Sequence, residues 1–150
     1  MLFALFLLSC LGCNENQIYK EYNKDFSTLQ WEKSKKIDFI PEIPDTVHTY
    51  KITLALRHVH GFQFRDMAVK LSSISPSGKS NSKDYTFPVM KGETEYLSQC
   101  AGDICDLETV IETNAHFNEA GKYTYTVEHL MPVDLLPNVM EFGLLIEKNP

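Results

Sequence analysis

The chain has 150 residues, of which 43 % are hydrophobic and 11 % aromatic, and it carries a formal net charge of −6. This length and composition predict one globular domain with its own core and exclude a disordered chain. The acidic balance excludes a nucleic-acid partner bound through phosphates, because such a surface needs a clustered basic face.

The chain begins with an apolar run over residues 1–8, which gives way to polar residues from Asn14. A membrane helix needs roughly 20 apolar residues, so the run predicts an export signal over residues 1–12. Cys10 and Cys13 each follow a small residue, which resembles the lipobox of bacterial lipoproteins, where the cysteine is acylated. The polar transition favours Cys13 as the lipidation site, and Cys10 is the alternative because Leu7 fits the lipobox. Acyl chains on either cysteine would anchor the protein to a membrane of the cell envelope.

Residues 13–30 are polar and irregular, with Tyr19, Tyr22 and Phe26 as their large apolar side chains. This composition predicts an N-terminal tether that docks partly onto the domain. The folded domain is then expected to occupy residues 31–150.

Beyond residue 31 the apolar residues alternate with polar ones, which is typical of strands with one buried face. The alternation predicts strands at residues 50–57, 67–71, 85–87, 106–112, 123–129 and 140–147. Turn residues separate these runs, and only residues 94–99 could form a helical turn or two. The pattern indicates an all-β fold, namely a single antiparallel β-sandwich of jelly-roll or immunoglobulin-like type.

Two cysteines remain outside the signal region, Cys100 and Cys105, with four residues between them. An oxidising compartment permits a disulfide between them, and two free thiols are the alternative. A metal site is disfavoured because this spacing, without a flanking histidine, does not match zinc-binding patterns.

The sequence contains no nucleophile elbow, no phosphate-binding glycine loop and no His-Glu-x-x-His helix. His58 and His60 would share one strand face, as in some metal sites, but the sequence assigns them no third ligand. Asp103 and Asp106 could form a carboxylate pair, although their loop setting favours hydrogen bonds that stabilise the turn. We therefore expect a protein with no enzymatic activity, no cofactor and no metal.

Exported β-sandwiches often bind glycans by stacking sugar rings on exposed aromatic side chains. Trp31, Tyr85 and Tyr96 are available for this role, although core packing is the default interpretation of single aromatic residues. A carbohydrate-binding lipoprotein is accordingly the alternative function.

Several segments together resemble the GldH family, the gliding-motility lipoproteins of the Bacteroidetes. Residues 13–19 hold a cysteine followed by a polar stretch and a tyrosine, and residues 75–79 form a Ser-Pro-Ser-Gly-Lys turn. Residues 102–106 contain a Gly-Asp-Ile loop, and residues 121–148 form the C-terminal block of the resemblance. Two departures are Pro132, where we expect an arginine, and Cys105, where the family more often has a tyrosine. The match over residues 13–19 favours Cys13 as the lipidated residue.

The resemblance implies a non-enzymatic lipoprotein of the gliding machinery, which is linked to type IX secretion, acting as a scaffold among envelope proteins. A domain of this kind would bind its protein partners through its edge strands and loops. The candidate partner-binding residues are Gly102, Asp103, Ile104, Asp106, Asp134, Leu136 and Pro137. Surface-exposed lipoproteins of this phylum tend to carry an acidic cluster after the cysteine, whereas residues 14–17 hold one acid, so we expect the domain to face the periplasm.

Overall fold

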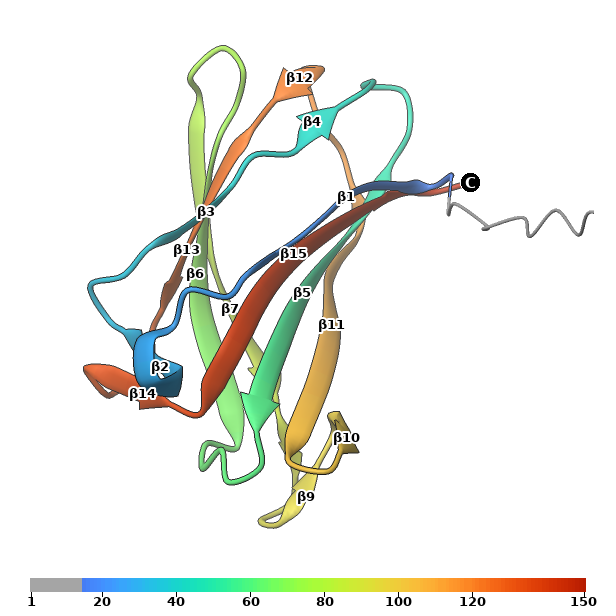
Figure 1. Ribbon diagram of the computed structural model, residues 1–150. Coiled ribbons are helices and arrows are strands. Elements are labelled where there is room, and N and C mark those ends of the chain that lie inside the picture. Colours follow the sequence, from blue (N-terminus) through green and yellow to red (C-terminus); the bar gives the residue numbers. More distant parts are fainter. Residues whose placement is uncertain (1–14) are drawn as a thin grey trace, which may run out of the picture.

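A computed structural model describes residues 15–150, so Cys10 and Cys13 lie outside the described residues. Two antiparallel sheets face each other in a β-sandwich, which confirms the predicted fold class (Figure 1). Within the described part of the chain the only helical segment is a short 3-10 turn at Ser27–Leu29. No helix there is long and apolar enough to cross a bilayer.

The larger sheet has the strand order β1-β15-β5-β11-β10. Its strands are β1 (Gln17–Asn23), β15 (Val139–Lys148), β5 (Tyr50–Val59), β11 (Ile104–Ala115) and β10 (Gln99–Ala101). The facing sheet has the order β3-β13-β6-β7. Its strands are β3 (Ile37–Phe39), β13 (Thr124–His129), β6 (Asp66–Ile74) and β7 (Ser80–Pro88). All six strands that the alternation predicts are present, most of them longer than predicted.

Three short pairs complete the fold. They are β12 (Gly121–Lys122) with β4 (Glu42–Ile43), β14 (Leu135–Pro137) with β2 (Gln30–Glu32), and β8 (Met90–Lys91) with β9 (Glu95–Tyr96). The segment 94–99, expected to form a helical turn if any segment did, instead contributes β9 and leads into β10. Tyr96 turns inward there and bonds to the turn after β5, and this tertiary contact outweighs the weak local propensity.

Apolar side chains from the inner faces of both sheets meet in one core. Ile52, Leu54 and Leu56 of β5 belong to this core, as the period of two requires, and Thr53 and Ala55 between them are buried as well, since β5 is the central strand of its sheet. Trp31 is fully buried, and its ring contacts those of Phe26, His129 and Phe142.

The segment expected to be a tether is part of the sandwich. Residues Gln17–Asn23 form β1, which pairs antiparallel with β15 from Gln17 opposite Glu147 to Asn23 opposite Phe142. Its alternation is inconspicuous because β1 is an edge strand with no fully buried residue. The folded domain thus begins at residue 17 rather than at residue 31.

The two ends of the sandwich differ in what they carry (Figure 1). At one end β1 begins beside the last residues of β15, and we call this the terminal end. The Lys148 amide donates there to the Asn16 carbonyl oxygen at 2.7 Å. The opposite end, the loop end, carries residues 60–65, 89–103 and 130–138. Strands of ten residues, such as β5 and β15, place the two ends about 30 Å apart.

Candidate functional site

The two loops proposed as partner-binding sites from sequence lie at the same end of the sandwich (Figure 1). The turn after β5 connects them. The His60 amide donates to the Asp103 carbonyl oxygen at 2.7 Å, and the Val59 amide donates to that of Asn138 at 2.9 Å. The Asn138 side chain also donates to the Gly61 carbonyl oxygen at 3.0 Å. The loop end is therefore one connected surface rather than two separate loops.

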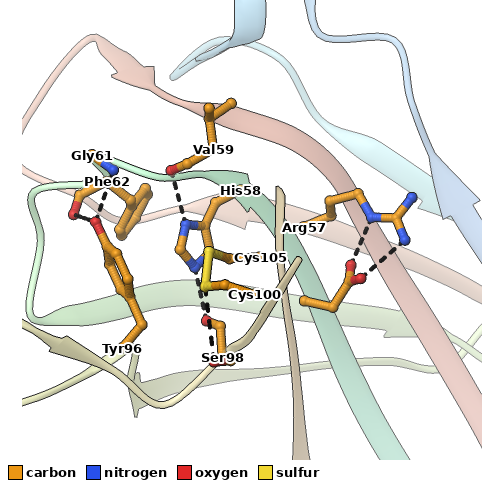
Figure 2. Close-up of a disulfide and its surroundings, with 10 residues drawn as sticks. Arg57, His58, Val59, Gly61, Phe62, Tyr96, Ser98, Cys100 and Cys105 are labelled. Carbon is orange, nitrogen blue, oxygen red and sulfur yellow. Dashed lines mark hydrogen bonds and ion pairs between the residues drawn. A yellow bond between two sulfur atoms is a disulfide. The ribbon is translucent and has the colours of Figure 1, made fainter. Parts of the chain in front are cut away.

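A disulfide closes the hairpin of β10 and β11. Cys100 lies directly opposite Cys105 in the strand register, and their sulfur atoms are bonded (Figure 2). The intervening turn needs Gly102, whose φ of +61° lies in the left-handed region. The crosslink therefore holds the hairpin tip in one conformation, with Gly102, Asp103 and Ile104 exposed.

Tyr96 fixes the neighbouring segment by hydrogen bonds to the backbone. Its hydroxyl accepts from the Gly61 amide at 3.0 Å and donates to the Phe62 carbonyl oxygen at 2.8 Å (Figure 2). Its ring also lies against the rings of His58 and His60. These contacts hold β9 to the turn after β5.

His58 is fully buried under this segment. Its Nδ1 donates to the Val59 carbonyl oxygen at 3.1 Å, and its Nε2 lies 2.8 Å from the Ser98 hydroxyl, which donates to it (Figure 2). Burial lowers the pKa of His58, so the ring is neutral at neutral pH. The structure corrects the expected face-sharing histidine pair, because β5 ends at Val59 and His60 lies exposed beyond it. In residues 15–150 no three or more His, Cys, Asp or Glu side chains gather as metal ligands.

Asp106 is engaged on the outer face of the larger sheet. Its carboxylate accepts two hydrogen bonds from Arg57, from Nε at 2.6 Å and from Nη2 at 3.1 Å. Arg57 also donates to Glu141 at 3.3 Å, so one guanidinium joins β5, β11 and β15. Asp106 therefore crosslinks strands and neither stabilises the turn nor pairs with Asp103.

Four of the nine large apolar side chains that are exposed in residues 15–150 lie at the loop end, while Val47 and Ile74 are exposed at the terminal end. Leu97, three residues before Cys100, is 45 % exposed, and Ile104, directly before Cys105, is 42 % exposed. Leu130 and Leu135 add further apolar surface beside β14. Apolar groups held open to solvent on a rigid loop are a feature of protein-binding surfaces.

The structure corrects one residue of the second candidate loop. Leu136 is fully buried and packs in the core, so it cannot contact a partner. Leu135 is the exposed residue, because β14 pairs with β2 and its side chains alternate inward and outward. Asp134 is exposed and its carbonyl oxygen accepts from the Lys33 amide, whereas Pro137 is half-buried.

The three aromatic residues considered for sugar stacking are engaged elsewhere. Trp31 is fully buried, and Tyr96 is held at the loop end. Tyr85 donates to Glu112 at 2.7 Å, and the Lys83 ammonium lies 4.9 Å from the centre of its ring. None of the three is an open platform for a sugar ring.

Replacing Cys100 and Cys105 together by alanine should lower the free energy of unfolding by about 2 kcal/mol, because the disulfide closes only a small loop in the unfolded chain. Urea unfolding of the oxidised protein and the double variant measures the difference. Reduced wild type is the control and should match the variant. Equal stability of the oxidised and reduced proteins would contradict this prediction.

The protein is thus a β-sandwich whose loop end is fixed by hydrogen bonds and a disulfide and exposes several apolar side chains. The family model described as GldH lipoprotein matches residues 17–146, and the chain therefore belongs to the GldH lipoprotein family. A protein of Christiangramia forsetii, named gliding motility lipoprotein GldH homolog, is 23 % identical over 99 % of this chain and 93 % of its own length. No solved structure matches the chain. The resemblance found in the sequence is confirmed, and membership implies a membrane-anchored protein of the cell envelope.

Proposed function

We propose that this protein is a non-enzymatic scaffold of the gliding-motility machinery, linked to type IX secretion. It is anchored through an acylated Cys13 and offers its loop end to other envelope proteins. The family and its curated relative support the motility assignment. The observation that carries the scaffold role is the position of the exposed apolar loop end, opposite the end at which β1 begins.

The short distance along the chain from Cys13 to β1 supports this orientation. Only three residues separate Cys13 from Gln17, the first residue of β1. A chain of this length reaches at most about 14 Å. An acylated Cys13 would therefore keep the terminal end close to the lipid leaflet and direct the loop end about 30 Å outward, toward partners in the periplasm.

The rigidity of the loop end supports a binding role. Leu97 follows Tyr96, whose hydroxyl bonds hold it in place, and Ile104 precedes the disulfide-bonded Cys105. A binding surface that is already ordered loses less conformational entropy when a partner docks. The two side chains are thus preorganised as the centre of a protein interface.

Replacing Leu97 and Ile104 together by serine should weaken partner binding about tenfold or more, because two apolar contacts leave the interface centre. The full-length lipoprotein and the variant are purified from native membranes, and co-purifying gliding and type IX secretion proteins are quantified by mass spectrometry. Val47, which is 84 % exposed at the terminal end, gives the matched control Val47→Ser.

Two results would contradict the proposal. One is equal recovery of those partners with the Leu97/Ile104 double variant and with wild type. The other is intact surface spreading and intact type IX secretion in a strain that lacks the gene. Equal melting temperatures of wild type and variant ensure that a loss of binding does not reflect unfolding.

A further inference from the structure

A groove of about 520 Å³ opens between the two sheets, far from the hairpin tip of the loop end. β7 is the edge of its sheet, and β11 pairs with β10 only over residues 104–106. Beyond Asp106, both strands are therefore unpaired on this side within the part of the chain that the structure describes. The gap between the two free edges is the mouth of the groove.

A β-bulge in β11 directs a carboxylate into this groove. Val110 lies opposite Thr53, but Glu112 lies opposite Ile52, so the register shifts at the residue between them. The extra residue moves Glu112 to the inner face, which Ile52 shares. A carboxylate aimed at the space between two sheets is costly unless it has partners.

Two side chains of β7 hold Glu112 in place. Its Oε1 accepts from Lys83 Nζ at 2.6 Å and from the Tyr85 hydroxyl at 2.7 Å. The Lys83 and Tyr85 hydrogen bonds lower the pKa of Glu112, so the carboxylate is ionised at neutral pH. Both bonds go to Oε1, and Oε2 accepts no hydrogen bond from residues 15–150, which leaves a spare acceptor on a side chain that lines the groove.

Hydrogen bonds across the groove limit its length. The contacts of Glu112 with Lys83 and Tyr85 cross it on one side. Toward the terminal end, Glu119 accepts from the Ser75 hydroxyl at 3.1 Å and from the Ser77 amide at 2.9 Å. The space between these crossings suits a compact ligand better than an extended peptide, which would have to displace them.

The lining selects for a neutral, hydrogen-bonding ligand. Two lysines and two glutamates line the groove, so its formal charges balance: Lys83 pairs with Glu112, and Lys79 interacts electrostatically with Glu119. Ser73, Asn81 and His116 line the groove, and their side chains make no hydrogen bond with the described residues. Tyr123 and Tyr125 of the lining are buried, and the half-buried Tyr85 is engaged by its bond to Glu112 and by the Lys83 ammonium over its ring, so no aromatic face is open for stacking.

We propose that this groove binds a compact, neutral, hydroxyl-rich ligand of the saccharide class. Glu112 Oε2 accepts from a ligand hydroxyl, while the Asn81 amide and the Ser73 hydroxyl bond to neighbouring hydroxyls. Recognition through hydrogen bonds alone, without a stacked aromatic ring, differs from the mode expected from Trp31, Tyr85 or Tyr96, of which only Tyr85 lines the groove. The site is independent of the partner-binding loop end.

Saturation-transfer NMR on the full-length lipoprotein in detergent micelles tests the proposal. The probes are glucose, galactose, mannose, N-acetylglucosamine and their disaccharides, at up to about 10 mM, where a millimolar site is occupied. At least one sugar should receive saturation, and Glu112→Ala should reduce its affinity about tenfold, because a hydrogen bond to a charged group is lost. Glu108→Ala is the matched control, since Glu108 is exposed on the outer face of the same strand and should leave binding unchanged.

Asn81→Ala provides a second variant, because Asn81 is exposed and its loss should not affect folding. It should weaken binding severalfold even if Glu112→Ala fails to fold. Absence of transfer to every sugar would overturn the proposal, as would equal binding by wild type and the Asn81 variant. Protection of the β7 amides by an added extended peptide, with no sugar binding, would instead assign this edge to strand addition.

Discussion

Replacing Trp31 by alanine should destabilise the domain by about 3–5 kcal/mol, the range for removing a fully buried large aromatic side chain. The ring lies 5.0 Å from that of Phe142 and 5.4 Å from those of Phe26 and His129, measured between centroids. Its Nε1 donates to the Lys35 carbonyl oxygen at 2.9 Å, so the substitution also leaves that acceptor without its partner. The cavity would open where β2 closes the core against β15.

Urea unfolding followed by far-UV circular dichroism measures this loss, because the variant lacks the fluorescent indole. Val47→Ala is the control, and an exposed residue of this kind should change stability by less than about 0.5 kcal/mol. A loss below about 1 kcal/mol for Trp31→Ala would mean that the indole is not a core residue. Trp31 would then again be a candidate for sugar stacking.

The strands of the two sheets could largely be predicted from the sequence, and Trp31 shows why other features could not. In β5 and β13, alternation over six or more residues reports which face is buried. A single aromatic residue has no such period, so its orientation depends on what packs against it. The ring of Trp31 is surrounded by residues from β13 and β15, more than 90 positions away in the chain.

The candidate site was predictable in part. The turn residues of the 102–106 segment mark a loop, and the structure shows an exposed turn at Gly102 and Asp103, whereas residues 104–106 begin β11 and Cys105 is buried. Contacts distant in sequence determine the rest. Leu136 points inward because β14 pairs with β2, about 100 residues earlier in the chain. Glu112 points into the groove because a bulge shifts its register against β5, and a single sequence does not reveal such a shift.

Replacing Gly143 by valine should destabilise the domain by about 1–3 kcal/mol and release β1 from the sheet. Gly143 lies opposite Tyr22 in the pairing of β15 with β1. A Cβ at this position would lie 2.6 Å from Tyr22 Cδ1 and 2.8 Å from Tyr22 Cε1, so the aromatic ring must move. The ring covers a glycine across two strands, an arrangement that stabilises edge pairing, and a larger residue removes it.

Hydrogen exchange read by mass spectrometry over residues 17–23 measures the release, since unpaired amides exchange faster. The double variant Tyr22→Ala/Gly143→Val is the control, because it removes the ring that causes the clash. It should recover part of the lost protection. Unchanged protection of residues 17–23 in the single variant would show that the sheet accommodates a side chain at this position.

Release of β1 would also separate anchoring from orientation. An acylated Cys13 remains attached to the chain, so the Gly143→Val protein should stay in the membrane fraction. The seven residues of β1 would become a flexible connection of up to about 25 Å, and the loop end would no longer be directed outward by the sheet. Partner recovery should then fall although Leu97 and Ile104 are unchanged. If recovery stays at the wild-type level while exchange shows β1 released, the loop end does not depend on its orientation to the membrane.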